Sequence, residues 1–170
     1  MKKIAILGST GSIGANTLDV LSRMKDDFKV VALSADSNIK LLSAQARRFR
    51  PKTIAIGNGS LASQIKKIVP AGTNILTGTE GLCAIAAATG VDMIVFAISG
   101  NACLLPLLEA IRYAKGIALA NKEALVSGGP LVMELARRRG VKILPVDSEH
   151  SAIFQCIEGR EAGLSKIYLT

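Results

Sequence analysis

The sequence predicts an α/β protein with a doubly wound, mostly parallel sheet, and three observations lead to this fold class. Short apolar runs of strand length alternate with segments of helical spacing along the chain. Several runs are apolar at consecutive residues, as in parallel strands that helices cover on both faces. The chain has 170 residues, 49% of them hydrophobic and only 4% aromatic, so we expect one aliphatic core of domain size. Right-handed crossovers then wind strand and helix into one sheet.

Eight apolar runs are expected to form the strands, with apolar stripes of helical spacing between them. The strand candidates are residues 3–7, 29–34, 53–56, 74–76, 93–97, 116–119, 142–144 and 166–169. The helical stripes are Leu18, Leu21 and Ser22; Leu41, Leu42, Ala46 and Phe49; Leu104, Leu107, Leu108 and Ile111; and Leu131, Leu135 and Ala136. Pro145 is the best candidate for a domain boundary, because the sequence after it is polar. A domain rarely ends on a bare strand, so the last run indicates a fragment.

The charge balance narrows the function classes. The net charge of +8 suits an anionic partner: a nucleic acid, an acidic lipid or a phosphorylated small molecule. The basic clusters 47–50, 66–67 and 137–139 fall at expected helix ends or on helix faces, where solvated cations complement the helix dipole. No apolar run approaches the roughly 20 residues of a membrane-spanning helix. Three cysteines without CxxC spacing, and no targeting segment, are typical of a reduced, cytoplasmic protein.

A glycine loop, Gly8-Ser-Thr-Gly-Ser-Ile-Gly14, follows the first strand and opens a helix. Gly8 lets the chain turn out of the strand, Gly11 lets a pyrophosphate approach the backbone, and Gly14 lets the helix pack closely. The expected phosphate donors are the N–H groups of Gly11, Ser12 and Ile13 and the hydroxyls of Ser9, Thr10 and Ser12. The loop predicts a Rossmann-like dinucleotide site. The alternative is a tight turn without a ligand.

The end of the second strand, Asp36-Ser-Asn38, is expected beside the adenosine ribose. A carboxylate there favours NAD, so Asp36 argues for NAD. Ser37, Asn38 and Lys40 leave room for a 2′-phosphate and argue for NADP. The residues alone leave this choice open, and the segment could instead cap the next helix.

Three polar segments follow later strands and should meet at the carboxyl edge of the sheet: 98–101, 120–123 and 145–150. Lys122 could donate to a substrate oxygen or a phosphate there. Asp147 and Glu149 are two residues apart, so both carboxylates face the same way in an extended segment, as suits Mg²⁺. Alternatively, Asp147 or Ser148 caps a helix at 152–157 and Lys122 forms a surface pair with Glu123.

The glycine loop, Ala120-Asn-Lys-Glu123 and Pro145-Val-Asp-Ser-Glu-His-Ser-Ala-Ile-Phe-Gln155 together resemble the 1-deoxy-D-xylulose 5-phosphate reductoisomerase family, in order and over the whole chain. The resemblance implies an NADPH-dependent oxidoreductase of the non-mevalonate isoprenoid pathway that forms 2-C-methyl-D-erythritol 4-phosphate with Mg²⁺ or Mn²⁺. Family members are much longer. We therefore expect an NADPH-binding domain over residues 1–145, the start of a truncated catalytic domain over 146–170, and no activity from these residues alone.

Site residues follow from the resemblance by motif. It implies Thr10, Gly11, Ser12 and Ile13 at the cofactor phosphates, Asp36, Ser37 and Asn38 at the adenosine end, and Asn121 and Glu123 near the nicotinamide. It implies Lys122, Ser148 and Glu149 at the substrate, Asp147 and Glu149 on the metal, and Lys122, Asp147 and Glu149 in catalysis. Asp36 departs from the glycine that is common in the family. His150 is expected to be structural. The implied partner is a phosphorylated sugar, with no nucleic acid and no membrane, and the full-length protein is expected to be a homodimer.

Two other classes stay open. The first is another Rossmann-type NAD(P)-dependent dehydrogenase, of the aldehyde or semialdehyde kind, which needs a cysteine nucleophile. Cys103 is the only candidate near a strand end. The second is a basic nucleic-acid-binding module, which the net charge favours but which lacks a recognition motif and interleaved aromatic residues.

Overall fold

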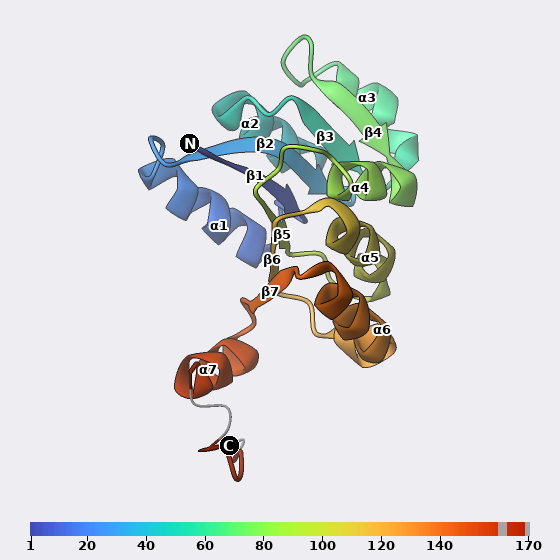
Figure 1. Cartoon of the computed structure of the whole chain (residues 1–170). Helices are drawn as coiled ribbons and strands as arrows, with labels where there is room; N and C mark the ends of the chain where they lie inside the picture. The colour runs from blue at the N-terminus through green and yellow to red at the C-terminus, as the bar shows by residue number, and fades with distance from the viewer. Residues whose placement is uncertain (160–162, 169–170) are drawn as a thin grey trace.

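The computed structural model describes residues 1–159 and 163–168, and it confirms the predicted α/β class. Seven parallel strands form one sheet in the order β4-β3-β2-β1-β5-β6-β7 (Figure 1). The strands are β1 (Lys2–Leu7), β2 (Phe28–Ala35), β3 (Thr53–Ile56), β4 (Asn74–Thr77), β5 (Met93–Phe96), β6 (Gly116–Leu119) and β7 (Lys142–Pro145). The strand order reverses between β1 and β5, which places a switch-point crevice at their carboxyl ends.

Helices cover both faces of the sheet. They are α1 (Ser12–Arg23), α2 (Ile39–Phe49), α3 (Ala62–Lys66), α4 (Gly78–Ala86), α5 (Leu104–Tyr113), α6 (Glu123–Arg139) and α7 (Ser148–Ile157), with short 3₁₀ turns η1 (Gly59–Leu61) and η2 (Asn101–Cys103). In β1, Ala5 and Leu7 pack into the core layer under α4, α5 and α6, whereas Ile4 and Ile6 pack into the layer under α1, α2 and α3. Because β1 is buried on both faces, its apolar residues are consecutive, as the sequence predicts.

The last part of the chain departs from the prediction. Lys166–Tyr168 form no strand, and Leu169 lies outside the described residues. Ile167 and Tyr168 are 50% and 81% exposed, and none of the seven strands of the sheet lies beside them to complete a ladder. Helix α7 extends away from the sheet and buries none of its residues (Figure 1).

Two helical details also differ from the sequence-based prediction. The short helix α3 and the buried helix α4 have no predicted counterpart, since neither carries a long apolar stripe. Leu131 and Leu41 belong to predicted stripes, yet they are 57% and 38% exposed, on the outer sides of α6 and α2. No described helix is both long and apolar enough to cross a membrane.

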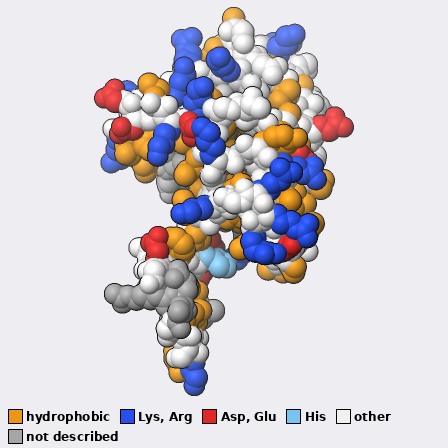
Figure 2. Space-filling model, in the orientation of Figure 1, with side chains coloured by type: hydrophobic (Ala, Val, Ile, Leu, Met, Phe, Trp, Pro, Cys, Tyr) orange, Lys and Arg blue, Asp and Glu red, His pale blue; other side chains and the backbone are white. Residues whose placement is uncertain are grey.

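The basic clusters are solvated helix ends, as expected. They occupy the last turns of α2, α3 and α6, where they face the negative ends of the helix dipoles. Arg137 and Arg138 both pair with Glu134, at 2.8 and 2.7 Å. Figure 2 shows Lys and Arg side chains in several separate groups on one face of the molecule, not joined into a stripe.

Candidate functional site

The fold requires two of the three loop glycines, Gly8 and Gly14. Gly8 has a φ of +88°, and a Cβ on it would collide with the carbonyl oxygen of Ala97. A Cβ on Gly14 would collide with the carbonyl oxygen of Gly8. Gly11 differs, since a Cβ there would lie 3.6 and 3.8 Å from those two oxygens, which is ordinary contact. The fold itself therefore does not demand a glycine at position 11.

A cavity of about 380 Å³ opens beside Gly11, at the switch point between β1 and β5. Its walls come from the glycine loop, the ends of β2 and β5 and the segment after β5. The lining residues are Gly8, Thr10, Gly11, Ser34, Ala35, Asp36, Gly57, Leu82, Ala97, Ile98, Ser99 and Ala102. Open parallel sheets bind ligands in this crevice.

Helix α1 begins directly after Gly11, which lines the cavity, and its first turn offers N–H donors to an anion. Gly11 is the N-cap of α1, and its own N–H donates to the carbonyl oxygen of Gly8 at 3.2 Å. Of the three predicted N–H donors, those of Ser12 and Ile13 are left to other acceptors, because the first N–H groups of a helix have no partner within it. Ser12 is exposed at the first helical position and Ile13 is half-buried. Ser9 is fully buried and its hydroxyl bonds within the protein, so the prediction of Ser9 as a phosphate donor is wrong. A helix N-terminus of this kind favours phosphate through both its N–H groups and its dipole.

The turn after β2 places a carboxylate at the cavity. Asp36 lines it, and its Oδ1 lies 2.5 Å from where a Cβ on Gly57 would be. Helix capping is the work of Asn38, whose Oδ1 accepts from the N–H of Leu41 at 3.1 Å. The capping alternative is therefore correct for Asn38 and wrong for Asp36. Ser37 is exposed between them.

Asn121 is buried, and its side chain hydrogen-bonds the segment after β5 to the start of α6 at the carboxyl edge of the sheet. Its Nδ2 donates to the carbonyl oxygens of Ile98 at 2.8 Å and Gly100 at 3.0 Å. Its Oδ1 accepts from the N–H of Ala124 at 2.7 Å and so supports the first turn of α6. In this structure the side chain holds the edge together, whereas its neighbour Glu123 is exposed.

The acidic segment after β7 is organised around Asp147. Its Oδ1 accepts from the N–H of His150 at 3.2 Å, which caps α7, and lies 2.6 Å from His150 Nδ1. Lys122 Nζ approaches Oδ2 at 3.7 Å. Burial raises the pKa of Asp147, but the hydrogen bonds from His150 and the charges of His150 and Lys122 outweigh it and hold that pKa below its usual value. Lys122 thus pairs with Asp147, whereas the alternative interpretation had placed it in a surface pair with Glu123.

Asp147 and Glu149 do not lie in an extended segment, which corrects the geometric premise of the metal prediction. Helix α7 begins at Ser148, because Asp147 caps it, and Glu149 stands exposed in the first turn. The Ser148 hydroxyl donates to Glu149 Oε2 at 2.7 Å; this bond lowers the pKa of Glu149, and the nearby charge of Asp147 opposes the shift. The described residues contain no group of three or more side chains suited to a metal ion, so this pair could form only part of a metal site.

Cys103 does not fit the nucleophile of an aldehyde-type dehydrogenase. It is fully buried in η2, and burial raises the pKa of its thiol to about 12. A thiol of that kind stays protonated at neutral pH, whereas a nucleophilic cysteine must be an accessible thiolate.

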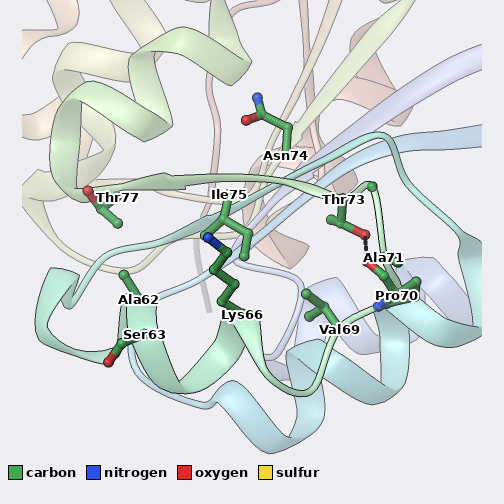
Figure 3. A pocket seen from close by; sticks show the side chains of 11 residues that line it. Ala62, Ser63, Lys66, Val69, Pro70, Ala71, Thr73, Asn74, Ile75 and Thr77 are labelled. Atoms are coloured by element: carbon green, nitrogen blue, oxygen red, sulfur yellow. Dashed lines mark hydrogen bonds between the residues drawn. The ribbon is translucent and has the colours of Figure 1, made fainter.

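A second, larger hollow of about 500 Å³ lies at the sheet edge between β4 and α3 (Figure 3). Lys66 extends from α3 toward Ile75, and the hydroxyl of Thr73 donates to the carbonyl oxygen of Pro70 at 2.8 Å. Its lining includes none of the predicted site residues. The candidate cofactor site is the smaller cavity beside Gly11, whereas Asn121, Lys122 and Asp147 line a separate hollow of about 250 Å³.

Comparison with known proteins agrees with this geometry. The family model for 1-deoxy-D-xylulose 5-phosphate reductoisomerase matches residues 4–129. The chain belongs to this family. It is 50% identical over its full length to the 1-deoxy-D-xylulose 5-phosphate reductoisomerase of a Synechococcus strain.

Solved structures of the family share the fold closely. The reductoisomerase of Zymomonas mobilis in complex with NADPH has a TM-score of 0.87 and 42% identity, over 91% of this chain and 41% of that one. A reductoisomerase in complex with NADPH, fosmidomycin and magnesium has a TM-score of 0.89 and 39% identity, over 96% of this chain and 41% of that one. The chain spans 44% of the length of the Synechococcus relative.

Proposed function

We propose that this chain forms the NADPH-binding part of an enzyme that converts 1-deoxy-D-xylulose 5-phosphate to 2-C-methyl-D-erythritol 4-phosphate in isoprenoid synthesis. The observation that carries the proposal is Gly11, a glycine that the fold does not require, set on a cavity between the loop, β2 and β5. Family membership and the NADPH complex of the Zymomonas relative support the choice of cofactor.

Each predicted residue then has a role that its position supports. Thr10, Gly11 and the N–H groups of Ser12 and Ile13 would hold the cofactor phosphates at the start of α1. Asp36 would lie at the adenosine ribose, with Ser37 and Asn38 in the same turn. Asn121 would position the nicotinamide end of the cofactor indirectly, by fixing the segment after β5 through its hydrogen bonds to Ile98 and Gly100. The exposed Glu123 would lie near the same end of the cofactor.

The catalytic part of the proposal concerns Lys122 and the segment 147–149. The bound nicotinamide supplies hydride, and Mg²⁺ or Mn²⁺ polarises substrate oxygens. Lys122 carries a 57% exposed side chain, so its ammonium could turn from Asp147 toward a substrate oxygen and stabilise developing negative charge. Asp147 and Glu149 would supply two metal ligands, and Ser148 would face the substrate. The remaining ligands would come from outside the described residues.

The domain boundary at Pro145 belongs to the same proposal. Strand β7, the last of the sheet, ends at Pro145, and α7 beyond it buries no residue against the sheet. Residues 1–145 would then form the NADPH-binding domain, and 146–170 the start of the catalytic domain. Sedimentation of the full-length protein would test the expected homodimer, and cell fractionation its cytoplasmic location.

Titration of the full-length protein with NADPH tests the cofactor assignment. We expect binding in the micromolar range or weaker, and weaker binding of NADH. Gly11→Ala should lower NADPH affinity by about tenfold, because its Cβ would project toward the pyrophosphate, while the thermal midpoint changes little. Unchanged affinity in this variant would rule out the loop as the phosphate site.

Gly116 offers a matched control. A Cβ there would lie 3.6 Å from the carbonyl oxygen of Asp92 and 3.8 Å from Met93 Cε, so it meets the same space as at Gly11. Gly116 begins β6, at the opposite end of the strands from the cavity. Gly116→Ala should therefore leave both stability and NADPH affinity intact.

A further inference from the structure

Three buried polar side chains lie behind the glycine loop. Ser9 of the loop is 0% exposed, Ser34 of β2 is 1% exposed, and Gln45 of α2 is 7% exposed. Buried polar groups are costly unless they are hydrogen-bonded, and no buried side-chain nitrogen or oxygen among the described residues lacks a partner. The three side chains therefore form a satisfied network that ties the loop to two separate elements.

Gln45 holds Ser9 through two reciprocal hydrogen bonds. Its Nε2 donates to the carbonyl oxygen of Ser9 at 2.7 Å, and its Oε1 accepts from the Ser9 hydroxyl at 2.7 Å. The orientation of the amide is fixed, because a backbone carbonyl can only accept. One side chain thus grips both the backbone and the side chain of a single loop residue.

Ser34 holds the same stretch from the sheet. The N–H of Ser9 donates to the carbonyl oxygen of Ser34 at 2.7 Å, and the N–H of Gly8 donates to the Ser34 hydroxyl at 3.0 Å. Gly8 and Ser9 are thereby fixed between β2 and α2. The next two residues, Thr10 and Gly11, line the cavity. The anchor and the ligand-facing part of the loop are therefore adjacent in the chain.

We propose that Gln45 is a positioning residue that holds the glycine loop in its phosphate-binding shape. It does not line the cavity, so it acts through Ser9 rather than by touching a ligand. The inference rests on the proposed function for its ligand, but the anchoring itself does not depend on it. Preorganised loops bind more tightly because less ordering is needed on binding.

Two substitutions in the full-length protein test the anchor. Gln45→Leu keeps the volume and removes both bonds, which leaves the buried Ser9 carbonyl without its side-chain donor. Gln45→Glu keeps the acceptor but loses the donor, and serves as the second variant if Gln45→Leu does not fold. Gln45→Leu should weaken NADPH binding by about tenfold. Ser43 is a matched control, because it is 5% exposed on the same helix and donates only to the carbonyl oxygen of Lys40.

A second ligand separates positioning from general destabilisation. Adenosine 2′-phosphate lacks the pyrophosphate, so its affinity should change less than about twofold in Gln45→Leu. Ser43→Ala should leave both affinities unchanged. An equal loss for both ligands, or no loss of NADPH affinity, would overturn the positioning role.

Amide hydrogen exchange of the ligand-free protein tests the anchor without any cofactor. Gln45→Leu should speed exchange across residues 8–14 by about tenfold and leave β6 unchanged. Equal loop protection in the wild type and the variant would refute the anchor, whether or not NADPH binds. Failure of the wild type to bind NADPH, with loop exchange still faster in the variant, would instead refute the proposed function alone.

Discussion

The glycine loop and the segment 147–150 both follow strands at the carboxyl edge of one sheet, yet they are built in opposite ways. The loop is fixed from behind by buried Ser34 and Gln45, and its outer side faces a cavity. In the acidic segment, residues 147–150, the polar side chains contact one another near the surface. Asp147 is hydrogen-bonded to His150 and paired with Lys122, and the Ser148 hydroxyl donates to Glu149.

We infer from this difference that the described residues form most of the proposed cofactor site but only part of the proposed metal site. A site that is buttressed by buried bonds and open on one side is ready for a ligand. In the segment 147–150, Asp147 caps a helix and pairs with Lys122, and Glu149 accepts a hydrogen bond from Ser148. Mg²⁺ needs several more oxygens than these two carboxylates supply. The predictions below break or sharpen this contrast, starting with the largest effect.

The largest expected effect is on turnover. In the full-length protein, Asp147→Ala or Glu149→Ala should reduce turnover of 1-deoxy-D-xylulose 5-phosphate by more than about 100-fold, beyond the usual cost of losing an outer-shell partner of a metal. NADPH affinity, measured by fluorescence titration, should stay within about twofold, because the cofactor cavity does not include these residues.

Glu158→Ala provides the control, since Glu158 is an exposed carboxylate at the opposite end of α7. It should leave turnover unchanged. We also expect the 170 residues alone to oxidise no NADPH with the substrate. Turnover by these residues alone, or loss of NADPH binding in Asp147→Ala, would show that cofactor and metal functions are not divided in this way.

The sequence predicts the sheet well because its strands are buried on both faces. Seven of eight predicted strands are confirmed to within two residues at each end. The eighth, at 166–169, is apolar too, but an apolar run becomes a strand only where a neighbouring strand offers hydrogen bonds. Helix α4 is missed because it has only nine residues, many of them with small side chains, and so shows no clear apolar stripe.

The site is predicted less completely, because the sequence does not reveal which distant side chains contact one another. The loop motif identifies Gly11 and Thr10, and the structure places both at the cavity. Gln45 is missed, because a glutamine in a helix gives no signal that it reaches Ser9, 36 positions away. The role of Asp147 and Glu149 as metal ligands stays a prediction, and their spacing alone does not reveal that Asp147 caps a helix.

The next effect is on folding stability, and it tests whether the glycine loop is rigid. Gly8→Ala should lower the free energy of unfolding by about 2 kcal/mol or more, because it combines a positive φ with a collision against Ala97. Gly100 has a φ of +72° and no atom within 4 Å of an added Cβ, so Gly100→Ala carries the φ penalty alone. Denaturant titration of both variants should show the larger loss of unfolding free energy for Gly8→Ala. Equal losses would mean that the loop shifts to accommodate the added Cβ and is not rigid.

A smaller effect is expected on cofactor choice. Asp36→Gly should raise the ratio of NADPH to NADH affinity, because it removes a carboxylate from the expected place of the 2′-phosphate. Repulsion at this exposed position is worth about 1 kcal/mol or less at physiological salt. Asp26→Gly removes one exposed charge elsewhere and should leave the ratio unchanged. A ratio that stays constant in Asp36→Gly, measured by paired titrations, would place the 2′-phosphate away from the turn after β2.

The smallest effect is a local response to acid, and it compares a carboxyl group of each region. Backbone donation from Lys3 and side-chain donation from Lys115 lower the pKa of Asp92, at the amino edge of the sheet. The pKa of Asp147 is also lowered, because its bonds from His150 and nearby charges outweigh burial. Both folded pKa values lie below the ordinary 3.8. Each contribution to stability is therefore complete above that value and is lost as pH falls through the lowered pKa.

Nuclear magnetic resonance of two amides can follow this response in the metal-free protein. The N–H of Lys3 donates to Asp92 Oδ2 at 2.8 Å, and the N–H of His150 donates to Asp147 Oδ1 at 3.2 Å, so each amide shift reports its own carboxyl. Both should titrate with midpoints below 3.8, and Asp92→Asn should abolish only the Lys3 response. Below the midpoint, exchange should rise in α7, which buries no residue, while β1 stays protected inside the sheet. Equal exchange in α7 and β1 would mean that the acidic segment and the sheet unfold together, and the contrast between them would fail.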